Sequence, residues 1–301
     1  MLTGYVSRAT GSDGTHSEAT YYLDHSPVTD PRMLGSAYSV LPETPEALCQ
    51  VAQGLIIHVL RGERYGVTLP SEQTTQVYTV RVEDMLAAMI EADPRPLTTP
   101  REPAARFIGT CRHYAVLLCS MFRARGIPAR ARNGFSAYLK RGRFSDHWVC
   151  EYWNGEKGRW RIADAQMDAV HRRVLGIDFD PLDVPRDEQI AAGEVWRRCR
   201  RGEMDPAQCG SLDIWGLDYV KDNLLRDVAA LNKEEMLPWD GCALSEKSCD
   251  AMHDRERALL DTLAELTAHT IQFPAIRGIY AAHPELQAKS LPNPHATAIG
   301  P

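Results

Sequence analysis

The sequence lacks several features that would assign it to a membrane or secreted class. It has no run of about 18 apolar residues, so no membrane-spanning helix is predicted. Residues 1–10 lack a basic segment followed by an apolar one, which argues against a secretory signal. We therefore expect a cytoplasmic protein whose thiols stay reduced. Its eight cysteines are then expected to be free.

An excess of positive charge is also missing. The formal net charge is −6, which argues against a nucleic-acid binder held by phosphate contacts. A zinc site is disfavoured, because the gap between Cys242 and Cys249 is wider than in a zinc knuckle and no fourth ligand is evident beside His253. We expect no metal and no other cofactor.

The chain contains no internal repeat and no Gly/Ser-rich linker, so its parts are expected to pack together. We predict an N-terminal segment of loops and short strands (1–43), a core (44–170), a helical extension packed on the core (171–272) and an irregular tail (273–301). Helices are predicted at 44–62, 82–91, 187–201, 217–232 and 254–269.

A periodic series of apolar residues supports an extension that packs on the core. An apolar residue recurs every three or four positions, which places one apolar face along a helix that must be buried. The stripe comprises Ile214, Leu217, Val220, Leu224, Val228 and Leu231. It would be buried against the core, or alternatively in the interface of a homodimer.

A buried helix is predicted after Gly109. Residues 115–122 are nearly all apolar, and basic residues, Gly126 and Pro128 follow them, which is typical of a helix end. Cys111 falls at the start of this helix, where free N–H groups and the helix dipole favour a thiolate. A thiolate is the nucleophile that amide or thioester chemistry requires. Position alone permits a buried structural cysteine equally well.

A hairpin is predicted downstream, with strands at 144–153 and 159–165. If its turn is centred on residues 155–156, His147 lies directly opposite Asp164. Opposed side chains have Cβ atoms about 4.5–5.5 Å apart, close enough for an imidazole–carboxylate hydrogen bond. That contact is the base–orienter pair of a catalytic triad. A slip of one residue would turn the carboxylate to the other face of the sheet.

Other residues are weaker candidates for these roles. His113 lies on the same helix as Cys111 but points away from its face, and neither Asp146 nor Asp168 satisfies the predicted pairing with His147. A basic series is explained by helix ends and a solvated loop, although some of its arginines could hold a substrate carboxylate. The series comprises Arg123, Arg125, Arg130, Arg132, Lys140, Arg141 and Arg143.

The order of a cysteine on a helix, a histidine on a strand and an aspartate on the next strand resembles the transglutaminase-like superfamily, a branch of the papain-like thiol enzymes. Four motifs carry the resemblance: Gly109-x-Cys111, Arg123-x-Arg125-Gly126-Ile127-Pro128-Ala129-Arg130, Asp146-His147-Trp148 and Trp160-x-Ile162-x-Asp164. It covers roughly residues 75–170, and the whole chain looks most like bacterial members with long helical extensions.

The resemblance implies an α+β fold, in which the nucleophile helix packs on an antiparallel sheet and a helical C-terminal extension follows. It also implies that Cys111 is the nucleophile, His147 the general base and acid, and Asp164 the group that orients the imidazole. The backbone N–H of Cys111 is a natural oxyanion donor. A second donor is expected upstream, with Gln76 and Tyr78 in a strand-like stretch as candidates.

The implied reaction is acyl transfer through a Cys-bound thioester. The substrate would be a peptide, another amide or an activated acyl compound, and the acceptor would be water or an amine. The alternative is a non-catalytic interaction protein that keeps this fold and uses its C-terminal helices. A degenerate member would be expected to have lost one of the three triad residues. Here all three stand at workable spacing, which favours the enzyme.

Overall fold

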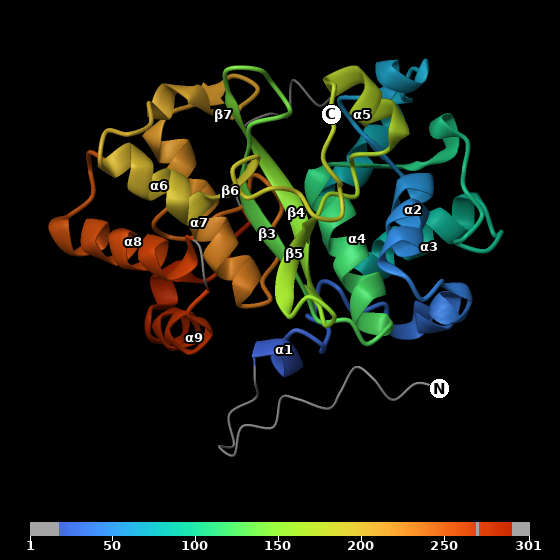
Figure 1. Ribbon diagram of the computed structural model, residues 1–301, viewed down its shortest axis with the longest axis horizontal. Helices are drawn as coiled ribbons and strands as arrows, with labels where there is room; N and C mark the ends of the chain where they lie inside the picture. Colours follow the sequence, from blue (N-terminus) through green and yellow to red (C-terminus); the bar gives the residue numbers. More distant parts are fainter. Residues whose placement is uncertain (1–17, 269–270, 291–301) are drawn as a thin grey trace.

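A central β-sheet lies between two groups of helices in the computed structural model, which describes residues 18–268 and 271–290 (Figure 1). The strands of this sheet are β3 (Ala129–Ser136), β4 (Phe144–Asn154), β5 (Arg159–Ala163), β6 (Gln189–Ala191), β7 (Cys209–Ser211) and β8 (Ile214–Trp215). Their order is β6-β3-β4-β7-β8, and β5 also pairs with β4. Only the β4–β7 pair is parallel in this sheet of the described chain.

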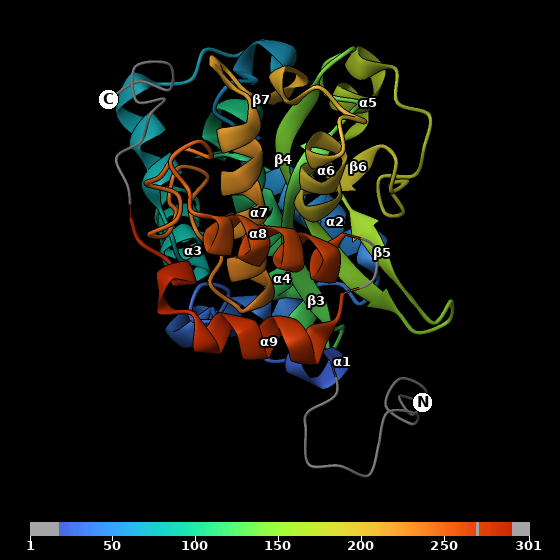
Figure 2. The same cartoon turned by 90° about the vertical axis from the view of Figure 1, so that its left-hand side faces the viewer.

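Helices cover both faces of the sheet. They are α1 (Glu18–Tyr21), α2 (Pro45–Leu55), α3 (Val82–Ala92), α4 (Cys111–Ala124), α5 (Ala169–Leu175), α6 (Ala192–Arg200), α7 (Leu217–Leu231), α8 (Asp254–Thr267) and α9 (Phe273–Ala282). Helix α4 packs on β3 and β4 from one side, and α7 packs on β3 from the other, with α8 and α9 outside it (Figures 1 and 2). No helix of the described residues is long and apolar enough to cross a membrane.

The predicted nucleophile helix is present as α4, and it is buried almost all round. Every residue from Cys111 to Arg123 is buried, because the sheet covers one side of the helix and α2 and α3 cover others. Leu118 and Phe122 share an apolar cluster with Trp148 of β4. The helix ends before Gly126, whose φ of 70° is left-handed and favours glycine.

The hairpin register differs from the prediction. The predicted turn at residues 155–156 would place Cys150 opposite Arg161. In the structure Cys150 pairs with Ala163, because residues 155–158 all belong to the loop. Two local features set this longer loop: the Asn154 side chain accepts a hydrogen bond from the Lys157 N–H at 2.7 Å, and Gly158 adopts a left-handed φ of 61°. A register shift of two residues keeps every side chain on its predicted face.

The helix predicted over 44–62 is wrong at its C-terminal end. It stops at Leu55, and Ile56–His58 form strand β1, which pairs in parallel with β2 (Phe107–Gly109). Ile56 continues the helical spacing, but consecutive β-branched residues favour a strand once a partner is available. The strand-like stretch predicted around Gln76 and Tyr78 is also wrong, since Ser71–Tyr78 form a 3-10 helix.

The C-terminal part does more than extend the core. The segment 171–272, expected to be helical, also supplies β6, β7 and β8 to the main sheet. Residues 273–282, expected within an irregular tail, form α9. In the N-terminal segment, the described part 18–43 holds α1 and a 3-10 helix (Arg32–Val40) rather than strands, and residues 1–17 lie outside the described chain.

The stripe on α7 is buried within the chain. Val220, Leu224, Val228 and Leu231 belong to an apolar cluster with residues of α6, α8 and α9. A second copy of the chain is therefore not required to cover this face.

Candidate active site

Cys111 is the first residue of α4, and Thr110 is its N-cap. The N–H of Cys111 therefore has no acceptor within the helix and faces the region where an anion is stabilised. The start of the helix is fixed by His113: its Nδ1 accepts a hydrogen bond from the Thr110 N–H at 3.0 Å, and its Nε2 donates to the Thr79 carbonyl at 3.0 Å. His113 thus has a structural role and is not free to act as a base.

His147 and Asp164 are in contact, although not through the directly opposed pairing that was predicted. The Nε2 atom of His147 lies 2.8 Å from Oδ2 of Asp164, and both side chains are about 1% exposed. The carboxylate is held by two further donors: the Tyr138 hydroxyl donates to Oδ2 at 2.6 Å, and the Gln166 N–H donates to Oδ1 at 2.9 Å. Three donors on one buried carboxylate fix its position and keep it ionised.

The electrostatics of this pair favour an imidazolium. Burial opposes a charged His147, but the Asp164 carboxylate outweighs it and raises the pKa of His147. Burial likewise opposes a charged Asp164, while His147 and Tyr138 outweigh it and lower the pKa of that carboxyl.

A cavity of about 380 Å³ contains the reactive atoms. Cys111 and His147 both line it, and Cys111 keeps 8% of its surface exposed there. Part of its lining is aromatic and comes from the C-terminal half of the chain, through Trp215, Tyr219 and Trp239. The 171–301 part therefore helps to shape the cavity in addition to packing on the sheet.

His58 and Arg61 also line this cavity, and sequence reasoning missed both. They belong to a turn at the end of β1, which lies beside Gly109 just before Cys111. The only signal in the sequence was the β-branched pair Ile56 and Ile57 before His58, which marks a short strand rather than a helix end.

The predicted second oxyanion donors are not in the cavity wall. The side-chain oxygen of Gln76 accepts a hydrogen bond from the Ile108 N–H at 2.7 Å. Tyr78 is 38% exposed and its ring lies 5.1 Å from that of Trp239. Gln76 and Tyr78 therefore contact residues near the cavity but do not line it.

The rival aspartates have other partners. Asp168 caps α5 by accepting a hydrogen bond from the His171 N–H, and it also binds the Tyr65 hydroxyl. Asp146 does line the cavity, but it accepts hydrogen bonds from Asn133, Asn223 and Tyr219 rather than from His147. Neither carboxylate takes the place of Asp164.

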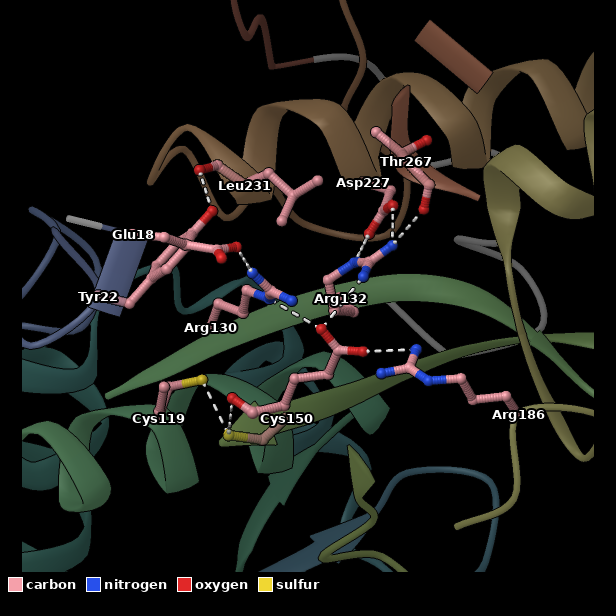
Figure 3. Close-up of polar contacts among 12 residues, drawn as sticks. Glu18, Tyr22, Cys119, Arg130, Arg132, Cys150, Arg186, Asp227, Leu231 and Thr267 are labelled. Carbon is pink, nitrogen blue, oxygen red and sulfur yellow. Dashed lines mark hydrogen bonds and ion pairs between the residues drawn. The ribbon is translucent and has the colours of Figure 1, made fainter. Parts of the chain in front are cut away.

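Arg130 and Arg132 lie on β3 in the interior, contrary to the prediction that helix ends and a solvated loop explain the basic series, whereas Arg123 does lie in the last turn of α4. The carboxylate of Glu151 on β4 contacts Arg130 at 2.8 Å and Arg132 at 3.1 Å. Arg132 also forms a two-point contact with Asp227 of α7, at 2.7 and 2.8 Å (Figure 3). Arg123 is buried as well, and it donates to the Ala129 carbonyl. Of the series, only Lys140 lines the cavity.

Metal binding finds no support in the described residues, where no group of three or more His, Cys, Asp or Glu side chains is arranged to hold an ion. Cys242 is buried and its sulfur contacts Ser245 at 3.9 Å. All eight cysteines are free thiols.

Comparisons with known proteins give a family match for part of the chain. Residues 66–165 match the family model described as the transglutaminase-like superfamily. No curated protein matches the chain. A solved structure described as a candidate cysteine protease from Cytophaga hutchinsonii aligns with 59% of this chain and 47% of its own, at 19% identity and a TM-score of 0.34. The chain thus spans about half of that protein's length.

Proposed function

Because residues 66–165 belong to the transglutaminase-like superfamily, we propose that the protein is a thiol enzyme that transfers an acyl group from an amide or activated acyl substrate to water or an amine. Cys111 is the nucleophile, His147 the general acid and base, and Asp164 the orienting carboxylate. The observation that carries this proposal is that Cys111 and His147 line one cavity while Asp164 holds the imidazole at 2.8 Å.

The first half-reaction forms a thioester on Cys111. The thiolate sulfur attacks the carbonyl carbon of the substrate, and the carbonyl electron pair moves to oxygen. When this intermediate collapses, the bond to the leaving nitrogen or sulfur breaks, and the leaving atom takes the proton of the His147 imidazolium. The raised pKa of His147 supports a ring that already carries this proton at neutral pH.

The second half-reaction releases the acyl group. Neutral His147 removes a proton from water or an amine as it attacks the thioester carbon, and the C–S bond then breaks. Cys111 leaves as a thiolate, which restores the ion pair. Water gives a carboxylic acid and an amine gives a new amide, so access of water to the closed site decides the product.

Two donors are proposed for the oxyanion. One is the N–H of Cys111, and the other is Nε2–H of His58. The Nδ1 atom of His58 accepts a hydrogen bond from the Leu60 N–H at 3.1 Å, so the proton of the neutral ring lies on Nε2. Burial, together with the charge of Arg61, lowers the pKa of His58 well below its usual range and keeps the ring neutral. A neutral imidazole is a suitable electrophile for a developing alkoxide.

Selective alkylation of Cys111 by iodoacetamide at pH 7 tests the proposal without a known substrate. Cys199 and Cys249 are the partly exposed thiols besides the site, so both are replaced by serine in the protein used. We expect fast labelling of Cys111, located by mass spectrometry, and slow labelling of the buried thiols. In His147→Ala, labelling should fall by about tenfold or more, because the thiolate loses its counter-ion.

Uniform slow labelling of all thiols in the folded protein would overturn the assignment and favour the interaction-protein alternative. The matched control is His113→Gln, since His113 is also a buried histidine near Cys111 but is held by Thr110 and Thr79. It should keep fast labelling as long as the protein stays folded.

A further inference from the structure

The turn that follows β1 is fixed to the strand before the nucleophile. The Val59 N–H donates to the Gly109 carbonyl at 2.8 Å and so extends the β1–β2 pairing. The Arg61 N–H donates to the His58 carbonyl at 2.8 Å and closes the turn. Cys111 follows Gly109 by two residues, so these hydrogen bonds hold the backbone of Arg61 at a fixed position relative to Cys111.

Arg61 has no acidic partner among the described residues. Its Nη1 donates to the Leu60 carbonyl at 3.1 Å. Its Nε is buried and has no hydrogen-bond partner among the described residues. No carboxylate of the described residues lies within ion-pair distance of its guanidinium. The side chain is half-buried and lines the cavity that contains Cys111. A cation in such a position favours an anionic ligand.

We propose that Arg61 binds a carboxylate of the substrate close to the carbonyl carbon that Cys111 attacks. The preferred acyl donors would then be amides or thioesters whose acyl part carries a free carboxylate. The planar guanidinium presents its N–H groups in a fork that matches the two oxygens of a carboxylate. This inference rests on the proposed function, because it assigns the substrate class of that same site.

The other charges of the cavity do not replace Arg61. The Lys140 ammonium lies 5.5 Å from the centre of the Trp215 ring, on the wall formed by the loop before β4. Asp146 is the anion of the cavity, and its oxygens are occupied by Asn133, Asn223 and Tyr219. A carboxylate ligand is therefore expected at the Arg61 end of the cavity, away from Asp146.

The test compares alkylation of Cys111 by iodoacetate and by iodoacetamide, which differ by a carboxylate in place of an amide. Both reagents lose iodide as the sulfur forms a bond to their CH₂ carbon. The measured quantity is the rate constant for iodoacetate divided by the rate constant for iodoacetamide. It is measured in the protein that carries serine at positions 199 and 249. The expected ratio is about tenfold higher than that of a small free thiol, because Arg61 holds the reagent carboxylate.

Variants separate a specific contact from a general positive field. Arg61→Gln should lower the ratio by about tenfold, and Arg61→Lys should keep part of the preference. The matched control is Arg64→Gln, which removes one positive charge from the same turn region but does not line the cavity. It should change the ratio by less than about twofold, since Arg64 is only partly buried and its charge acts from outside the cavity lining.

Each outcome decides a different question. Equal ratios in the wild type and Arg61→Gln overturn the assignment of Arg61, and so does an equal loss in Arg64→Gln. Slow reaction of Cys111 with both reagents overturns the proposed function itself. A high ratio that only Arg61→Gln abolishes, with Arg61→Lys as the partial rescue, supports a substrate that carries a carboxylate.

Discussion

The Oδ2 atom of Asp164 lies 2.8 Å from Nε2 of His147, although the two residues are not directly opposed in the hairpin. Asp164 is the first residue after β5. Its N–H donates to the Pro181 carbonyl at 2.7 Å, and its Oδ1 accepts from the Gln166 N–H. The carboxylate is therefore placed by the chain that follows the strand rather than by cross-strand pairing.

Replacing the Asp164 carboxylate should reduce the reactivity of Cys111 without abolishing it. In Asp164→Asn the amide keeps the shape of the side chain but cannot stabilise the imidazolium. The alkylation rate of Cys111 at pH 7 should fall by about tenfold or more, a loss that corresponds to about 1.4 kcal/mol of ion-pair stabilisation. Turnover, once a substrate is found, should be reduced severely but incompletely.

The control for this change is Tyr138→Phe. The Tyr138 hydroxyl donates to the same oxygen of Asp164 at 2.6 Å, but it carries no charge. Its loss should reduce the rate by less than Asp164→Asn does. Equal losses in the two variants would mean that the Asp164 charge is unimportant.

The His147–Asp164 pair should also make stability depend on pH. The pKa of His147 is raised to about 10 in the folded protein, so its stabilising contribution is complete below about pH 6.5 and is lost as the pH rises through the folded value. Asp164 has a lowered pKa, so its contribution is lost as the pH falls below about 3.8.

Urea unfolding of the wild type and His147→Gln between pH 6 and 10.5 measures this effect. The difference in unfolding free energy between the two proteins should shrink steadily toward the alkaline end. A difference that stays constant over this range would contradict a protonated, ion-paired His147.

The helix that begins at Cys111 and the strand that carries His147 could be predicted because their signals are local. The apolar run of 115–122 and the stop at Gly126 define α4, and β-branched and aromatic residues define β4. The register was missed because it depends on two features of the loop, the hydrogen bond between Asn154 and Lys157 and the left-handed conformation of Gly158. His147 and Asp164 are still in contact, because the chain that follows β5 holds Asp164 through Pro181 and Gln166.

The turn at 58–61 could not be predicted because its signal is not local. Strand β1 has three residues, and it exists through parallel pairing with β2, about fifty positions further along the chain. Before that partner is known, Ile56 simply continues the helical spacing of α2. The C-terminal strands β6 to β8 were missed for the same reason, since each has two or three residues.

Limited proteolysis should not divide the chain into two independent parts at residues 171–186. The segment after this connection supplies β6 to the edge of β3 and β7 to β4, and α7 packs on the sheet. A nick at this connection should leave the two pieces associated in gel filtration. Two separately soluble, stable fragments would contradict an integral C-terminal part.

The contact of Arg132 with Asp227 should be a main link between the sheet and α7. Arg132 is 5% exposed, and its guanidinium contacts both oxygens of Asp227, one oxygen of Glu151 at 3.1 Å and the Thr267 carbonyl at 3.2 Å (Figure 3). Arg132→Met leaves two buried carboxylates with fewer partners, so the free energy of unfolding should fall by about 3–5 kcal/mol.

Two further variants distinguish this loss from a general effect of removing charge. Arg186→Gln removes a cation that contacts Glu151 at 3.0 Å but is 45% exposed, so it should cost less than about 1 kcal/mol. Adding Asp227→Leu to Arg132→Met removes the stranded carboxylate, and the double variant should regain part of the lost stability, since a whole buried pair can be replaced at little cost. If Arg132→Met costs no more than Arg186→Gln in urea unfolding, this link does not hold α7 on the sheet.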